Sequence, residues 1–317
     1  MSNRPTSQES GKMPETCPAP DFSKFNVHDS FINSISSPAA AGEEHRRLSR
    51  QQLEEVSASL GERDREIIRT IQRYRYLLTG QIQRLYFSDA ATPSAALRAA
   101  SRALKKLREM GLIDHLARRI GGVRAGSGGL VWYLTHAGER LLRLREQSAS
   151  PMRPYTEPSP YFLAHSLAVA DIAVQLTELC REQPETKLTA LQPEPECWRS
   201  YSEYGTIMAL KPDLFAMTVS GQYEDRWFIE VDLDTESPAK IIGKCEKYHK
   251  YYRTGLEQEE TGVFPLTVWI VPTLERKEKL ITRIREAFDK QPKLFAVITN
   301  DELAHLIQYG GDKQILC

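Results

Sequence analysis

A proline-rich stretch divides the 317-residue chain into two parts. Four of the residues between Ser148 and Pro160 are proline, which donates no backbone hydrogen bond to a helix or a sheet. Proline-rich segments are extended, semi-rigid spacers, so we expect residues 148–160 to form a linker. The chain is long enough for a folded domain on each side of it.

The N-terminal 48 residues differ in composition from both parts. They are rich in Ser, Pro, Ala and Gly and show no sustained apolar period, which is typical of a disordered tail. The expected organisation is therefore a tail over residues 1–48, a first domain over 49–147, the linker, and a second domain over 161–317.

Composition excludes several classes of protein. The hydrophobic share of 41% and the charged share of 26% are those of an ordinary globular protein. No run approaches the roughly 18 apolar residues of a membrane span, and the N-terminus lacks the apolar core of a signal peptide, so we expect a cytoplasmic protein without a membrane partner. The five cysteines are irregularly spaced, which argues against a disulfide framework and a zinc site.

Charge is distributed unevenly, although the formal net charge is zero. Residues 61–150 contain 17 Lys and Arg against 8 Asp and Glu, a net charge of +9. The rest of the chain contains 25 against 34, a net charge of −9. A basic part joined to an acidic part points to a nucleic-acid partner.

Apolar residues at helical spacing predict three helices in the basic part, over residues 63–78, 79–86 and 93–110. The third helix has an apolar face with Leu97, Ala100, Leu104 and Leu107. Its other face is basic and free to contact phosphate, with Arg98, Arg102, Lys105 and Lys106.

A glycine-rich hairpin follows the three predicted helices. Two strand-like runs, over residues 112–117 and 130–135, flank a tip that carries Arg118, Arg119 and Arg124. Three helices and a two-stranded wing are the order of a winged helix-turn-helix, in which the third helix enters the major groove of double-stranded DNA. The sequence therefore predicts an α+β winged helix-turn-helix domain that binds duplex DNA through these basic residues.

A fourth helix is expected from His136. Its apolar residues are Ala137, Leu141, Leu142 and Leu144. They can pack on the first domain or pair with a second copy of the chain, so a homodimer stays open as an alternative.

The acidic part has the pattern of an α/β domain with a mixed sheet. An apolar helix is expected over 165–179, and strands over 187–192, 213–219, 226–233, 266–271 and 293–298. Helices over 238–253 and 277–289 separate the later strands.

Acidic residues recur where two of these strands begin or end. Asp213 opens one strand, and Glu230 and Asp232 project to the same face of the next, because strand side chains alternate with period two. Pairing of the two strands would bring Asp213 and Glu230 together. Clustered carboxylates repel one another unless a cation compensates, so we expect Asp213 and Glu230 to bind Mg²⁺ or Mn²⁺.

This pattern resembles the PD-(D/E)XK nuclease superfamily, whose motif is a Pro-Asp on one strand and an acidic-X-Lys on the next. Asp232 stands at the position of the family's catalytic lysine. Lys240 or Lys244 on the following helix can supply the ammonium group, and Lys244 shares a helix face with Tyr248. The resemblance implies a metal-dependent DNA endonuclease, or nickase, with catalytic residues Asp213, Glu230, Asp232 and Lys244.

A second resemblance covers both domains, from about Arg63 to Tyr252. Its motifs are Tyr133-Leu-Thr-His-Ala-Gly138, His165-Ser-Leu-Ala-Val-Ala-Asp171, Lys211-Pro-Asp213 and Phe228-Ile-Glu-Val-Asp-Leu-Asp-Thr-Glu236, followed by Lys244 and Tyr248. They are similar to those of the replication-relaxation family of mobile-element proteins. This resemblance implies a role in plasmid or integrative-element replication, mobilisation or control.

Two alternatives remain at this point. The chain can be a non-enzymatic DNA-binding regulator or replication accessory protein, whose nuclease-like domain serves dimerisation or docking. It can also be a relaxase with a tyrosine nucleophile among Tyr248, Tyr251 and Tyr252, although the paired His-X-His cluster of rolling-circle relaxases is lacking.

Overall fold

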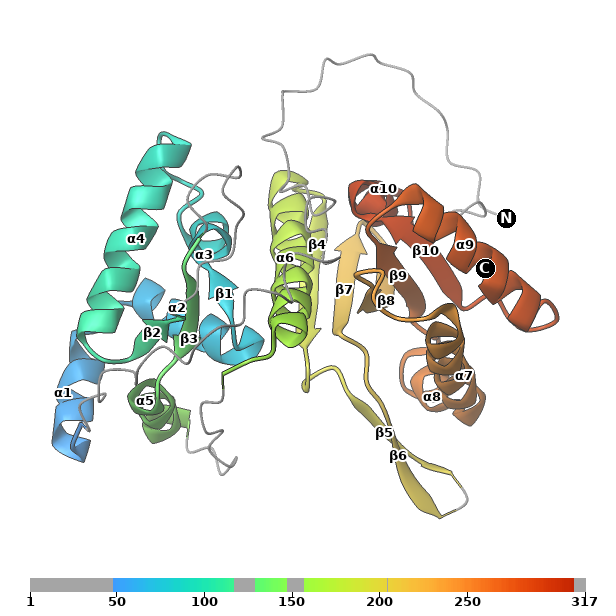
Figure 1. The fold of residues 1–317 in the computed structure, drawn as a ribbon, viewed down its shortest axis with the longest axis horizontal. Helices are drawn as coiled ribbons and strands as arrows, with labels where there is room; N and C mark the ends of the chain where they lie inside the picture. Colours follow the sequence, from blue (N-terminus) through green and yellow to red (C-terminus); the bar gives the residue numbers. More distant parts are fainter. Residues whose placement is uncertain (1–47, 117–128, 147–156, 204, 311–317) are drawn as a thin grey trace. The chain divides into compact units, whose positions relative to one another are not determined.

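The computed structural model describes residues 48–116, 129–146, 157–203 and 205–310. These residues form a mixed α/β protein with a five-stranded mixed sheet. The helical N-terminal part contains α1 (Arg50–Ser59), α2 (Glu62–Tyr74), α3 (Thr79–Tyr86), α4 (Pro93–Glu109) and α5 (His136–Glu146), as Figure 1 shows.

A small sheet accompanies these helices. Its strands are β1 (Leu77–Leu78), β2 (Ile113–His115) and β3 (Val131–Leu134), in the order β1-β3-β2 with antiparallel pairing. The arginines expected at the tip between β2 and β3, Arg118, Arg119 and Arg124, lie outside the described residues.

Helix α4 begins and ends where its sequence dictates. The side chain of Thr92 accepts a hydrogen bond from Ala95 N, Pro93 occupies the first turn, and Gly111, just beyond the helix, has φ of 75°. The buried side chains are Ala96, Ala100, Leu104 and Leu107. Our assignment of Leu97 to the apolar face was wrong, because Leu97 is 46% exposed and the smaller Ala96 packs in its place.

Helix α5 contributes to the same core. Ala137, Leu141 and Leu142 are buried in the cluster formed by α1 to α4, while Leu144 is exposed. Most of the apolar residues of α5 therefore pack within the chain, and α1, which the sequence analysis did not predict, contacts α5 as well.

The larger sheet has the strand order β10-β9-β8-β7-β4. The strands are β4 (Thr186–Pro193), β7 (Leu214–Ser220), β8 (Tyr223–Val231), β9 (Leu266–Val271) and β10 (Phe295–Thr299). Strand β7 is antiparallel to β4 and β8, whereas β8, β9 and β10 run parallel.

Helices cover both faces of this sheet. Leu214 and Ile229 belong to the core that α6 (Pro160–Glu182) and α10 (Leu303–Tyr309) complete, whereas Phe215 and Phe228 belong to the core under α7 (Pro238–Thr254) and α9 (Leu274–Phe288). Alternate residues thus face opposite layers, which explains why these strands are almost continuously apolar. The remaining elements are β5 (Arg199–Glu203), β6 (Thr206–Leu210), α8 (Leu256–Thr261) and the short 3₁₀ helix η2 (Asn300–Glu302).

Helix α6 starts five residues earlier than the sequence predicted. Ser159 caps it by accepting a hydrogen bond from Phe162 N at 3.2 Å, and Pro160 takes an early helical position where its missing N–H costs nothing. Within the described part of the chain α6 is the one helix long and apolar enough to cross a membrane, which our estimate of apolar runs had missed. Its burial against the sheet accounts for that composition.

Polar contacts also join α6 to α3. Gln81, which is buried, donates to Leu167 O at 2.9 Å, and Arg84 donates to Asp171 Oδ1 at 2.8 Å. Arg84 also binds the carboxylate of Glu178.

Candidate functional site

Two buried carboxylates lie side by side at one end of β7 and β8. Leu214 pairs with Ile229, so Asp213, just before β7, lies next to Glu230 on β8. Asp213 N donates to Ile229 O at 3.1 Å, and Asp213 Oδ2 accepts from Val231 N at 2.8 Å. The structure therefore brings together the two acidic residues that strand pairing predicted.

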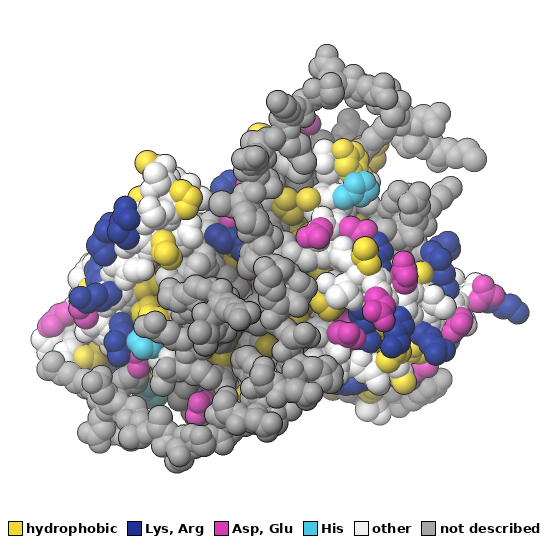
Figure 2. Space-filling model, turned by 45° about the horizontal axis from the view of Figure 1, so that its top comes forward, with side chains coloured by type: hydrophobic (Ala, Val, Ile, Leu, Met, Phe, Trp, Pro, Cys, Tyr) yellow, Lys and Arg dark blue, Asp and Glu magenta, His cyan; other side chains and the backbone are white. Residues whose placement is uncertain are grey.

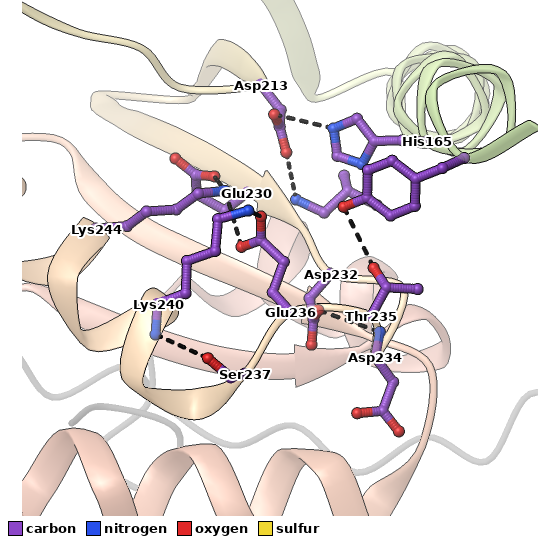
Figure 3. A network of polar contacts seen from close by, with 12 residues as sticks. His165, Asp213, Glu230, Asp232, Asp234, Thr235, Glu236, Ser237, Lys240 and Lys244 are labelled. Carbon is purple, nitrogen blue, oxygen red and sulfur yellow. Dashed lines mark hydrogen bonds and ion pairs between the residues drawn. The ribbon is translucent and has the colours of Figure 1, made fainter. Parts of the chain in front are cut away.

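Helix α7 supplies two polar groups to Glu230. Lys244 Nζ lies 3.2 Å from Glu230 Oε2, and the Tyr248 hydroxyl donates to Glu230 Oε1 at 2.7 Å. The two side chains point to the same carboxylate because residues four apart share a helix face. Lys244 also lies 3.3 Å from Glu236 Oε2, as Figure 3 shows for the wider network.

Burial makes Glu230 hard to ionise. Its removal from water raises the pKa of Glu230 above the usual range, and the neighbouring Asp213 carboxylate raises it further, against the opposing effect of Lys244. Burial alone would lower the pKa of Lys244, but Glu230, Asp213 and Glu236 raise it above its ordinary value. Lys244 is therefore a permanent cation beside two carboxylates that repel each other.

His165 is a site residue that the sequence analysis missed. It projects from α6, and its Nε2 lies 3.2 Å from Asp213 Oδ1 (Figure 3). Burial alone would lower the pKa of His165, but the contact with Asp213 raises it above 6.5. The one signal in the sequence is its position at the start of the motif His165–Asp171.

A third carboxylate lies close to this pair. Glu194 directly follows β4, whose last residue Pro193 pairs with Leu214 beside Asp213. Burial raises the pKa of Glu194, and the charge of Asp213 raises it further. Three acids thus lie at the same end of the sheet: Glu194 just after β4, Asp213 just before β7 and Glu230 on β8.

Asp232 lies in a different network from the one predicted. Its Oδ2 accepts a hydrogen bond from Arg276 Nε at 2.6 Å, and Arg276 also donates to Glu236 O at 2.6 Å. Asp232 and Arg276 are both nearly fully buried. The carboxylate of Asp232 thus neutralises Arg276 and joins the end of β8 to α9, while Lys244 contacts Glu230 and Glu236.

Buried tyrosines on α7 are poor candidates for a nucleophile. Tyr248 and Tyr251 are 1% and 4% exposed, and their hydroxyls donate to Glu230 and Glu257. Burial, the largest cause, raises the pKa of each phenol. A tyrosine that attacks DNA must be accessible and activated, so these two fit a structural role.

The predicted basic residues of α4 are exposed. Arg98, Arg102, Lys105 and Lys106 all belong to its solvent face. Figure 2 shows Lys and Arg side chains along the left side of the molecule, where α4 lies in Figure 1. Lys106 Nζ lies 2.6 Å from Asp64 and Lys105 Nζ lies 3.8 Å from Glu109, so acidic neighbours partly neutralise these two.

Asp213 and Glu230 offer carboxylate oxygens, the type of ligand that a divalent metal ion requires. The described residues contain no cluster of three or more His, Cys, Asp or Glu arranged to enclose an ion. Magnesium, however, is bound through one or two carboxylates together with water and substrate phosphate. Asp213 and Glu230 are two adjacent carboxylates, the hard oxygen donors that Mg²⁺ and Mn²⁺ take, so the donor chemistry is compatible with either ion.

The fold and site define an α/β protein with an acid-lysine cluster at the end of a mixed sheet. The model of the replication-relaxation family matches residues 68–267, which include every element from β1 to α8 in chain order, with β7, β8 and α7 among them. The chain belongs to the replication-relaxation family, and this membership indicates a role in plasmid or mobile-element replication or relaxation. No curated protein and no solved structure matches the chain.

Proposed function

We propose that this chain binds DNA of a mobile element and nicks it in a metal-dependent reaction. The observation that carries the proposal is the adjacency of Asp213 and Glu230, with Lys244 3.2 Å from Glu230. Two carboxylates and a lysine are the groups needed to hold a divalent cation and to stabilise charge on a phosphodiester. Membership of the replication-relaxation family supports DNA as the substrate.

Each residue of the site has a part in this reaction. Asp213 and Glu230 would hold Mg²⁺ or Mn²⁺, which supplies Lewis-acid activation of the phosphate and of water. Lys244 stabilises the negative charge that develops on the phosphate oxygens. Tyr248 orients Glu230 through its hydroxyl, and His165 orients Asp213.

The sheet supports a PD-(D/E)XK nuclease-like domain over residues 161–317. In the strand order β10-β9-β8-β7-β4, Asp213 directly precedes β7 and Glu230 lies on the neighbouring β8, with α6 on one face of the sheet and α7 on the other. In this proposal residues 49–147 form the winged helix-turn-helix that delivers the second domain to duplex DNA, and the linker ends before Ser159, which caps α6.

A non-enzymatic regulator is the second candidate, and one observation favours it. Each oxygen of the Asp213 and Glu230 carboxylates already contacts a protein group: His165, the Val231 N–H, Tyr248 or Lys244. A site satisfied in this way is also what a purely structural acid cluster requires. The protein would then bind DNA and dock partners without cutting.

Incubation with supercoiled plasmid and Mg²⁺ or Mn²⁺ distinguishes these functions. We expect nicking by the wild type, its loss in Asp213→Ala and Glu230→Ala, and its retention in Asp301→Asn, which changes an exposed acid elsewhere. A covalent protein–DNA adduct that disappears in Tyr248→Phe would replace the metal mechanism with the tyrosine mechanism. Tight, salt-sensitive binding without cutting would leave the regulator.

A further inference from the structure

Two exposed aromatic side chains open α6 beside the acidic site. Tyr161 is 47% exposed and Phe162 is 38% exposed, in the first helical turn after the Ser159 cap. Tyr161 precedes His165 by four residues, so the two side chains share a face of the helix. They are separated by about 6 Å along the helix axis, and His165 contacts Asp213. The ring of Tyr161 therefore lies on the rim of the site.

A second element holds Tyr161 at this rim. The hydroxyl of Thr235 donates to the Tyr161 hydroxyl at 3.3 Å, and Thr235 belongs to the segment that follows β8. This segment also contains Glu236, which binds Lys244 (Figure 3). The aromatic ring is thus attached to the same network that positions the lysine.

Phe162 lies beside the guanidinium group of Arg75. The guanidinium carbon of Arg75 lies 5.6 Å from the centre of the Phe162 ring, and Tyr76 meets the ring edge-on at 6.4 Å. Arg75 has φ of 67°, in the positive range that a residue with a Cβ rarely adopts because of steric strain. Such conformations persist where surrounding structure holds them, and they concentrate at functional sites.

We propose that Tyr161, Phe162 and Arg75 form a binding platform for unpaired DNA, in which the rings stack on bases and the guanidinium attracts phosphate. Exposed aromatic rings with a neighbouring arginine are what single-stranded nucleic acid recognises. A base offers its face to a ring only when it is unstacked, which a closed duplex does not allow. Tyr161 and His165 are about one helical turn apart, and His165 contacts Asp213. A base stacked on Tyr161 would therefore lie next to a phosphate bound beside Asp213 and Glu230.

This inference rests on the proposed function for its location, and it sharpens the substrate to single-stranded or locally melted DNA. The test measures binding under conditions that prevent cutting, so that the binding platform and the proposed nicking activity can fail independently of each other. Fluorescence anisotropy of a labelled oligo(dT) strand in EDTA measures affinity for the full chain. We expect Tyr161→Ala and Phe162→Ala each to weaken binding by about 5-fold or more, the usual effect of removing one stacking ring.

Three further variants serve as controls in this experiment. Tyr161→Phe keeps the ring and loses only the hydrogen bond to Thr235, so it should bind the strand like the wild type. Tyr309→Ala removes a 61% exposed ring from α10, and it should leave affinity for the strand unchanged. Affinity for a closed duplex should stay within about 2-fold of wild type in the Tyr161→Ala/Phe162→Ala double variant, because α4 carries that contact.

Specific outcomes would overturn the platform. Equal strand affinity in the double variant and the wild type excludes stacking. An equal loss of strand and duplex binding assigns the effect to the fold as a whole, and thermal unfolding of the double variant checks this directly. A change in oligomeric state by sedimentation, with strand affinity unchanged, makes the aromatic pair a contact between copies of the chain.

Discussion

Arg84 on α3 and Asp171 on α6 form an ion pair of 2.8 Å that joins the helical part to the sheet domain. Asp171 is 2% exposed, so its carboxylate needs partners within the protein in place of water. We expect Arg84→Met to lower the free energy of unfolding by about 3 kcal/mol, because removal of one partner leaves a buried charge uncompensated. Urea unfolding measures the change.

The exposed pair of Arg50 and Glu54 is the control for Arg84. These two residues lie four apart on α1, with Nε 3.0 Å from Oε1, and both are largely open to water. Arg50→Met should cost no more than about 0.5 kcal/mol. Similar losses in the two variants would show that burial of Asp171 contributes little.

His249 makes stability depend on pH. Burial lowers its pKa below 6.5, the charge of Arg253 lowers it further, and its ring stacks on Phe288 at 4.6 Å. Because the folded pKa is lower than the unfolded one, the contribution of neutral His249 is full above pH 6.5 and is lost as pH falls through the folded pKa.

The expected result is a pH-dependent difference between the wild type and His249→Phe. As pH falls from 7 to 5 the wild type should lose stability relative to the variant, because the folded pKa of His249 lies below its unfolded value. His305→Phe, at an exposed position on α10, serves as the matched control. A constant difference between wild type and His249→Phe over this range would contradict a buried, neutral His249.

Much of the fold was predictable, because its strands and helices have distinct periods. The apolar runs of β7, β8 and β9 and the helix α7 lie where the sequence analysis expected them. The start of α6 was misplaced because Pro160 was assigned to the linker, although a proline after a capping serine is also a helix start. The hairpin β5–β6 was missed because its strands alternate weakly and its Ile207 side chain is 82% exposed.

The acidic site was predictable only where local pairing determines it. Asp213 and Glu230 meet because their strands are consecutive in the sheet, and Lys244 follows on the next helix. His165 is 48 residues from Asp213, and Arg276 is 44 residues from Asp232. Neither contact has a periodic signal, since packing of distant helices on the sheet creates it.

The exposed arginines of α4 give a prediction about duplex binding. Each phosphate contact that is removed should reduce the slope of log affinity against log salt by about 0.9. We expect this reduction in Arg98→Ala and in Arg102→Ala, measured by anisotropy with duplex DNA at several salt concentrations. Arg283→Ala on α9, also exposed, should leave the slope unchanged. Unchanged slopes in the α4 variants would move the duplex-binding surface elsewhere.

Divalent metal should stabilise the fold through Asp213 and Glu230. A ligand at 100 times its Kd adds about 2.7 kcal/mol to the free energy of unfolding, which raises the Tm of a domain of this size by roughly 5–10 °C. We therefore expect Mn²⁺ to raise the Tm of the wild type and of Asp301→Asn, but not of Asp213→Asn or Glu230→Gln. Without metal, Glu230→Gln should melt no lower than the wild type, because it removes a buried carboxylate whose pKa burial and Asp213 raise. An equal Mn²⁺ shift in all four proteins would place the metal away from this pair, since only two of them retain both carboxylates.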